Sequence, residues 1–150
     1  PSGRGWEMGA NMYTIYEVNN GVSKPWANCD ILTSAIQICN NISEKYHCRM
    51  IVVNQKASLY DVGSQYDPNK KLVLISPAEI TGANMYTIYE VKNGICKPWA
   101  DCDILTYAMQ ICNAVSQINH SHMIVVNECD SLVMYDVGSH YDPDERVVIL

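Results

Sequence analysis

Hydrophobic and polar residues follow two different periods in the first part of the chain. Residues 13–18 (YTIYEV) are rich in β-branched and aromatic side chains, which predicts a strand. The Asn19-Asn20-Gly21 run supplies the positive φ angles of a tight hairpin turn, and we expect a returning strand over residues 22–26. Apolar residues then keep helical spacing, which predicts a helix over residues 31–45 with Asp30 as its N-cap.

Beyond the predicted helix the pattern is typical of strands and turns. Residues 50–53 and 59–62 are predicted to form a second hairpin, and a turn at Asp67-Pro68 leads into a last strand over residues 72–75. The runs at 50–53 and 72–75 are apolar at consecutive positions, as expected for strands that are buried on both faces. One helix covers only one face of such a sheet, so the other face requires a second cover.

The whole pattern occurs twice. The segment that begins at Gly9 is closely repeated from Gly82, and the last predicted strand of the second copy spans residues 147–150. After Leu59 and Leu132 the second copy carries two additional residues, Val133 and Met134. We place this insertion inside a strand, because two extra residues preserve the alternation of faces. The chain therefore divides into an expression tag or upstream remnant (1–8), repeat 1 (9–76), a short connector (77–81) and repeat 2 (82–150).

The fold class that follows is α+β, with two tandem ββαβββ-type repeats. Each repeat is expected to have an antiparallel-rich sheet and one helix. The nearest cover for the open face of each sheet is the other copy, so we expect the two repeats to pack as one pseudo-twofold unit. A homo-oligomer of chains would serve the same purpose.

Charge narrows the range of partners. Ten Lys and Arg against sixteen Asp and Glu give a net charge of −6, which argues against nucleic acid and against an anionic membrane surface. The charge is divided unevenly, because residues 9–76 hold six basic and five acidic residues, whereas residues 82–150 hold three and nine. We expect a basic partner to bind the second copy and an anion, if one binds, to choose the first.

The cysteines favour a reducing compartment over a disulfide framework. The count of seven is odd and no CxxC pair occurs, so we expect free thiols and an intracellular, cytoplasmic protein. Cys29 and Cys102 precede the predicted helices, where the helix dipole can increase thiol reactivity. The histidines at positions 47 and 120 lie at the opposite helix ends, about 20 Å away along a helix of this length. A cysteine–histidine enzyme is therefore not expected, and neither is any other catalytic function.

Two further groups of polar residues have ordinary structural explanations. The YDVGS-x-YDP segment carries Asp61 and Asp67 in the first copy, and an aspartate before proline is common in turns. His120 and His122 are weak candidates for metal ligands, since alternate residues of a strand share a face. Only the second copy has this pair, so we expect no metal and no cofactor.

Aromatic residues are the most suggestive feature for function. The chain has no Phe, but it has ten Tyr and three Trp, which favour half-buried surfaces at interfaces and ligand pockets. We therefore expect a non-catalytic protein-interaction or scaffolding module. The alternative is a metabolite- or nucleotide-binding protein whose pocket lies at the seam between repeats. The candidate binding residues recur in both copies: Tyr16, Trp26 and Tyr66, and then Tyr89, Trp99 and Tyr141.

Overall fold

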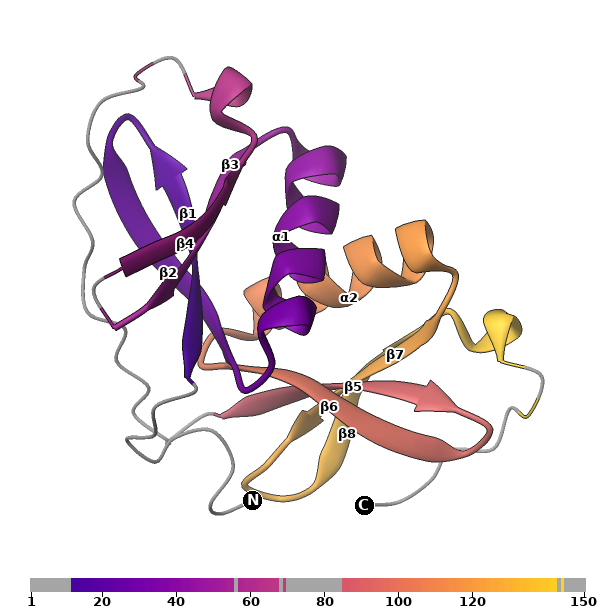
Figure 1. Ribbon diagram of the computed structural model, residues 1–150. Coiled ribbons are helices and arrows are strands. Elements are labelled where there is room, and N and C mark those ends of the chain that lie inside the picture. The colour runs from indigo at the N-terminus through magenta and orange to yellow at the C-terminus, as the bar shows by residue number, and fades with distance from the viewer. Residues whose placement is uncertain (1–11, 56, 68, 70–84, 143, 145–150) are drawn as a thin grey trace.

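The computed structural model describes residues 12–55, 57–67, 69, 85–142 and 144. These residues form an α+β fold with one eight-stranded antiparallel sheet and two helices, which confirms the α+β part of the prediction (Figure 1). The expected strands at 72–75 and 147–150, the connector 77–81 and the segment 1–8 lie outside the described residues.

The same order of elements occurs in both halves of the chain. The first half contains β1 (Tyr13–Asn19), β2 (Val22–Cys29), α1 (Leu32–Tyr46), β3 (Arg49–Asn54), β4 (Ala57–Val62) and the short 3₁₀ turn η1 (Ser64–Tyr66). The second half contains β5 (Tyr86–Lys92), β6 (Ile95–Cys102), α2 (Leu105–Asn119), β7 (His122–Asn127), β8 (Leu132–Val137) and η2 (Ser139–Tyr141).

The sheet is continuous across the two halves, in the order β4-β3-β1-β2-β6-β5-β7-β8. The halves join edge to edge where β2 pairs with β6, through Asn28 and Asp101. The hydroxyl groups of Thr14 and Thr87 donate hydrogen bonds of 2.7 Å to the side chains of Asn28 and Asp101, respectively. The join lies in the part of β2 beyond residue 26, so the strand is longer than the sequence pattern predicts.

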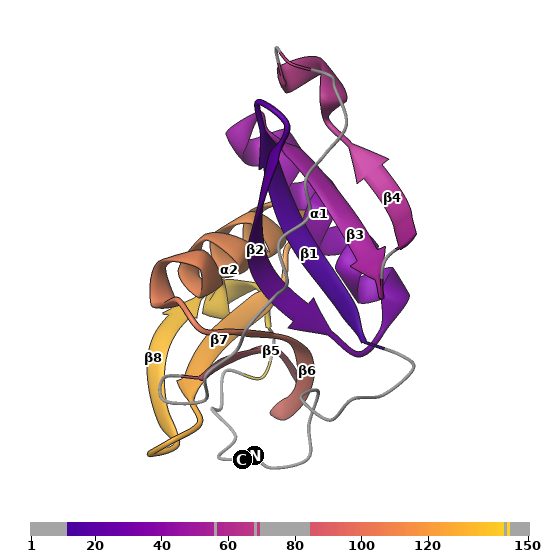
Figure 2. The ribbon, with the colours of Figure 1, turned by 90° about the vertical axis from the view of Figure 1, so that its left-hand side faces the viewer.

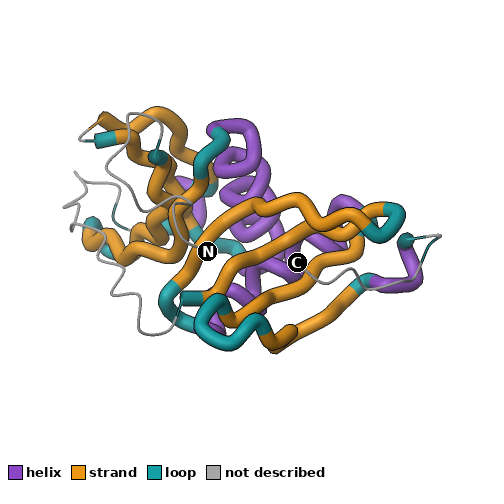
Figure 3. Tube along the Cα trace, turned by 90° about the horizontal axis from the view of Figure 1, so that it is seen from below, coloured by secondary structure: helices purple, strands orange, loops and turns teal. Residues whose placement is uncertain are grey.

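Both helices lie between the two groups of strands, where α1 packs against α2 (Figures 1 and 3). The view in Figure 2 shows the strands of the first half in front of α1, with α2 beside them. Each helix also contacts a strand of the opposite half, α1 with β6 and α2 with β2. Side chains of both halves therefore form one hydrophobic core, which includes Ile38 and Ile42 from α1 and Ile111 and Val115 from α2.

A β-bulge at Trp26 directs this side chain into the core. Ile15 pairs with Ala27 but the next residue, Tyr16, pairs with Pro25, so Trp26 is the additional residue in the ladder. Proline has no N–H to donate to the ladder, and a bulge is one of the few places where a strand accommodates it. Trp99 is the additional residue of β6 in the same way. Both indoles belong to the hydrophobic core.

Strands β3 and β7 are buried on both faces, as the apolar runs predict. In the first half, Met50 and Val52 face the helices, whereas Ile51 and Val53 join Tyr16 in a smaller buried cluster. In the part of the chain that the structure describes, each smaller cluster contains residues of one half only. Within the described ranges, the other half therefore contributes its helix to the inner face and no cover to the outer face.

Two predictions of local structure are wrong. The N-cap of α1 is Ile31 rather than Asp30, and the side chain of Ile31 makes no capping hydrogen bond. The two additional residues of the second copy also lie elsewhere, because β7 ends at Asn127 and β8 begins at Leu132, whereas β3 ends at Asn54 and β4 begins at Ala57. A hairpin loop changes length without altering the register of its strands, so the insertion lies in the loop and not at Val133 and Met134.

The two bulged tryptophans provide a test of the contact between the halves. Trp26 stacks on Tyr107 of α2 with ring centroids 4.5 Å apart, and the first half has Ser34 at the position of Tyr107. We expect Trp26→Ala to lower the free energy of unfolding more than Trp99→Ala, by about 0.5–1.5 kcal/mol, the contribution of a stacked pair. Urea unfolding of both variants measures the difference, and Tyr107→Ser should remove it. Equal losses in the two variants would contradict the stacking contribution.

Candidate functional site

The six aromatic candidates do not form a common surface. Four of them are buried, with exposed fractions of 3 to 8%, whereas Tyr66 and Tyr141 are 39% and 36% exposed. The polar atoms of buried rings are satisfied internally, since the Nε1 groups of Trp26 and Trp99 donate to the nearby carboxylates in bonds of 3.0 Å. Burial therefore assigns four candidates to packing: Tyr16, Trp26, Tyr89 and Trp99.

The seam between the halves is formed by packed side chains. Lys24 lies over the ring of Tyr107, 5.5 Å from its centroid, beside the stacked Trp26. Farther along the helices, Lys45 of α1 donates a hydrogen bond to Gln117 of α2. The residues that line the cavity described below all belong to the second half. A small-ligand pocket at the seam therefore stays a prediction.

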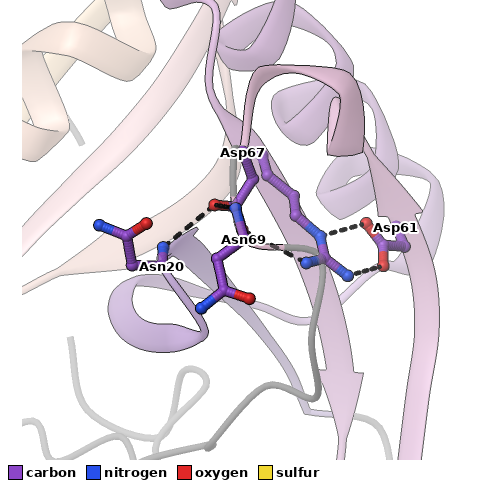
Figure 4. Close-up of polar contacts among 5 residues, drawn as sticks. Asn20, Asp61, Asp67 and Asn69 are labelled. Atoms are coloured by element: carbon purple, nitrogen blue, oxygen red, sulfur yellow. Dashed lines mark hydrogen bonds and ion pairs between the residues drawn. The ribbon is translucent and has the colours of Figure 1, made fainter.

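An arginine between two carboxylates is the central polar feature of the first half. Arg49 Nε and Nη2 donate to the two carboxylate oxygens of Asp61 at 3.1 and 2.8 Å, and Nη1 lies 3.4 Å from Asp67 Oδ2. Asp67 also accepts hydrogen bonds from the backbone N–H groups of Asn20 and Asn69, at 3.1 and 3.2 Å (Figure 4). The cluster ties η1 to β3, β4 and the β1–β2 turn.

The electrostatics of this cluster favour the ionised carboxylate. Desolvation acts to raise the pKa of Asp67, which is almost fully buried. The backbone N–H groups and Arg49 outweigh this effect and hold the pKa below its usual value. Hydrogen bonding to Asp61, reinforced by both carboxylates, raises the pKa of Arg49, so the guanidinium stays charged.

The second half repeats this cluster with a histidine in place of the arginine. His122 occupies the first position of β7, opposite Val91, as Arg49 occupies the first position of β3, opposite Val18. Its Nε2 atom lies 2.7 Å from Asp136 Oδ1, and since a carboxylate accepts, Nε2 carries the proton of this bond. Asp142 accepts the same backbone hydrogen bonds as Asp67 does, from residues 93 and 144.

The smaller imidazole leaves two buried polar atoms without a hydrogen-bond partner among the described residues. His122 Nδ1 and Asp142 Oδ2 are 3.8 Å apart, too far for a hydrogen bond, and both side chains are at least 99% buried. The residues His122 and Asp142 are among those that line a cavity of about 220 Å³ at one end of the second half. Its walls come from β5, the β5–β6 turn, the end of α2 and η2: Glu90, Val91, Lys92, Asn93, Asn119, His120, Ser121, Tyr141 and Asp142 besides His122.

A glycine allows η2 to approach this site. Gly138 has a φ of +81°, and a Cβ atom added there would lie 2.4 Å from the backbone oxygen of Ser121. Any larger residue would push η2 away from the connection between α2 and β7. The close approach brings Tyr141 and Asp142 to the cavity, where the rings of His120 and Tyr141 are 5.1 Å apart.

The expectation that His120 and His122 share a strand face is wrong. His120 is the C-cap of α2, in the left-handed conformation with a φ of 56°, and β7 begins only at His122. Both histidines nevertheless line the cavity. Among the described residues, no group of three or more His, Cys, Asp and Glu side chains could hold a metal ion.

The Asp136–His122–Asp142 arrangement was not predicted from the sequence. Both aspartates were expected to have ordinary structural roles, Asp142 in a turn before proline, although the pairing of β7 with β8 and the turn at η2 bring them to either side of His122. One difference between the copies could have indicated this cluster. Both copies keep the two aspartates, but the second copy has His122 at the position of Arg49.

None of the seven cysteines, all of which the structure describes, forms a disulfide, and burial raises the pKa of several of them. Desolvation raises the pKa values of Cys39, Cys102 and Cys112 well above their usual range, and raises that of Cys48 to about 11. Cys102 is fully buried, so desolvation outweighs any lowering of its pKa by the helix dipole. This position is therefore not an activated nucleophile.

Comparison of the chain with protein-family models, with curated proteins and with solved structures finds no match. Neither helix in the described ranges is long and apolar enough to cross a membrane. The site is therefore interpreted from its own geometry.

Thiol reactivity should follow burial. We expect Cys129, which is exposed, to react first with N-ethylmaleimide, and Cys39, Cys102 and Cys112 to react last, because desolvation disfavours their thiolates. Timed alkylation of the native protein followed by peptide mass analysis measures the order. Early modification of Cys102 would instead indicate that the helix dipole outweighs desolvation at this position.

Acid sensitivity should depend on Asp67. Because its pKa is lowered in the folded state, its stabilising contribution is complete above the unfolded value of about 3.9 and is lost as the pH falls through the folded value. We expect Asp67→Asn to lower the free energy of unfolding at pH 7 and to reduce its further loss at pH 3. Urea unfolding at both pH values measures this, with exposed Glu44→Gln as the control. An unchanged pH dependence in Asp67→Asn would contradict this account.

Proposed function

We propose that the chain is a non-catalytic protein-interaction module made by tandem duplication, with its partner surface on the second half. In this proposal, two repeats are related by a pseudo-twofold axis at the β2–β6 join. The recurrence of the element order and the symmetric order of the sheet, from β4 at one edge to β8 at the other, support this arrangement.

The observation that carries the proposal is the exposed apolar run on the outermost strand β8. Leu132, Val133 and Met134 are 58%, 46% and 41% exposed, although all three are large and consecutive. Tyr60 pairs with Val52 in the first half as Tyr135 pairs with Val125 in the second, so these two tyrosines are equivalent. The three residues before Tyr60, which correspond to the β8 run, are Ala57, Ser58 and Leu59. Leu59 is also exposed, at 47%, so the halves differ at Leu132 and Val133, where the first half has Ala57 and Ser58. The larger apolar surface on one strand of one half favours a contact site over a general property of the fold.

The side chains of β8 offer more to a partner than its backbone does. Met134 is the additional residue of a bulge between Val125 and Val126 of the neighbouring strand. Bulges on edge strands disrupt the ladder and limit the addition of further strands. The contact in this proposal is therefore a side-chain surface, formed by Leu132, Val133 and Met134.

Charge indicates the chemistry of the partner. Asp130 precedes this surface and Asp136 follows it, in the half that holds nine acidic residues against three basic ones. An acidic rim around an apolar centre complements a partner segment that combines Lys or Arg with apolar side chains. We therefore propose a basic, amphipathic segment of another protein as the partner.

The test exchanges the β8 surface for its counterpart in β4. A displayed library of random peptides is selected on the wild-type protein, and we expect enrichment of peptides that combine basic and apolar residues. The double variant Leu132→Ala with Val133→Ser carries the first-half residues, and its affinity for the enriched peptides should fall at least about tenfold, as for a typical hot spot.

The matched control is the reverse exchange, Ala57→Leu with Ser58→Val, which should leave the affinity at β8 unchanged. Enriched peptides that bind the Leu132→Ala, Val133→Ser variant as tightly as the wild type would contradict the proposal. Self-association that this variant abolishes, measured by light scattering on a sizing column, would identify the surface as a contact between copies of the chain instead.

A further inference from the structure

We propose that the cavity beside His122 binds a guanidinium group, which the second half takes from outside because it lacks the arginine of the first half. This site is separate from the β8 surface, and the inference holds whether or not that surface binds a partner. Two equivalent polar clusters, one in each half of the chain, support this inference.

The first half shows how this fold accommodates a guanidinium. Arg49 places the group between Asp61 and Asp67, with each carboxylate held by its own strand or turn. Asp67 is aligned for this role by the backbone N–H groups of residues 20 and 69. The N–H groups of Arg49 therefore meet carboxylate acceptors on two edges of the guanidinium, and the pair with Asp61 is bidentate.

The second half retains both aspartates, but its histidine forms a hydrogen bond with only one of them. Asp136 receives the Nε2–H group of His122, and Asp142 keeps the backbone hydrogen bonds from residues 93 and 144. Asp142 Oδ2, the atom equivalent to the partner of Arg49 Nη1, has no hydrogen-bond partner among the described residues. A buried carboxylate oxygen in this state is costly, and a charge-assisted hydrogen bond would remove the penalty.

His122 supplies the second acceptor. In this proposal the imidazole of His122 carries one proton, on Nε2, and has a lone pair on Nδ1, which is buried and 3.8 Å from Asp142 Oδ2. Two acceptors at this separation suit the adjacent N–H groups of one guanidinium, which are fixed in a planar fork. An anion or a neutral acceptor would meet lone pairs at both positions.

The remainder of the cavity is consistent with a cationic ligand. Its volume of about 220 Å³ accommodates a guanidinium with part of an alkyl chain. The charged groups on its walls are Glu90, Asp142 and Lys92, two negative against one positive. Tyr141 and His120 add aromatic rings, on which guanidinium groups stack.

The first experiment uses the wild-type protein and two cations of matched charge. Methylguanidinium donates hydrogen bonds, whereas tetramethylammonium cannot. We expect methylguanidinium at millimolar concentration to shift the ring ¹⁵N resonances of His122 in a saturable manner and to raise the unfolding temperature, while tetramethylammonium does neither. A Gly-Arg-Gly peptide forms the third arm: tighter binding than methylguanidinium indicates a protein side chain as the source, and equal binding indicates a free small molecule.

Two reciprocal variants test the assignment of the site. His122→Arg places a guanidinium on the chain itself, so it should raise the unfolding temperature and weaken methylguanidinium binding at least about tenfold, the loss of one charge-assisted hydrogen bond. Arg49→His should create an equivalent site in the first half and raise the number of bound methylguanidinium ions from one to two. The titration of the wild type decides the question even where a variant does not fold.

Several results would overturn the proposal. Equal effects of methylguanidinium and tetramethylammonium would identify a response to charge alone. No saturation by methylguanidinium at tens of millimolar, or unchanged binding in a folded His122→Arg variant, would exclude this cavity as the site. Ring ¹⁵N shifts that show both nitrogens of His122 protonated at neutral pH would mean that the imidazolium itself pairs with Asp142.

Discussion

The packing of α1 against α2 is the interaction on which the rest of the structure depends. Each half has a single helix for a sheet of four strands, and the buried faces of both helices contribute to one core. The helices also contact strands of the opposite half, so the hydrophobic stabilisation of each half includes surface supplied by the other. The β2–β6 join adds only one residue pair to this contact.

A shared core restricts where the two halves can diverge. Positions that face it are filled by the same or similar residues, such as Ile38 and Ile111, because a change of volume there would create a cavity or a clash. The informative differences lie outside it, at the exposed run on β8 and at the position of Arg49 and His122. In the first half Arg49 contacts both aspartates of its cluster, whereas the second half keeps a larger apolar surface on β8 and a buried carboxylate oxygen without a hydrogen bond among the described residues. These two differences are the basis of both proposals.

The sequence predicted the local elements and failed where distant residues determine the outcome. Hydrophobic periodicity located the strands and helices of the described residues, because each face had to be buried. The same reasoning placed Trp26 and Trp99 on a surface, since an indole has a polar group to satisfy. The structure satisfies it internally with Glu17 and Glu90, two strand residues that the bulges bring into reach.

The polar cluster of the second half was beyond prediction for a related reason. Asp136 and Asp142 lie 14 and 20 residues after His122, and only the β7–β8 pairing and the turn at Gly138 bring them together. The location of the insertion was also missed, because matching Leu59 to Leu132 in the sequence takes no account of the bulges that set the true register. Strand register is a tertiary property, and periodicity alone does not determine it.

Native-state hydrogen exchange tests the shared core most directly. If the two helices form one core, the slowest backbone N–H groups of β1 and β3 and those of β5 and β7 should exchange through the same global unfolding, with equal free energies and equal dependence on urea. Trp26→Ala should lower both sets together. Two distinct free energies, one for each half, with only the first lowered by Trp26→Ala, would contradict the account and show that the halves fold independently.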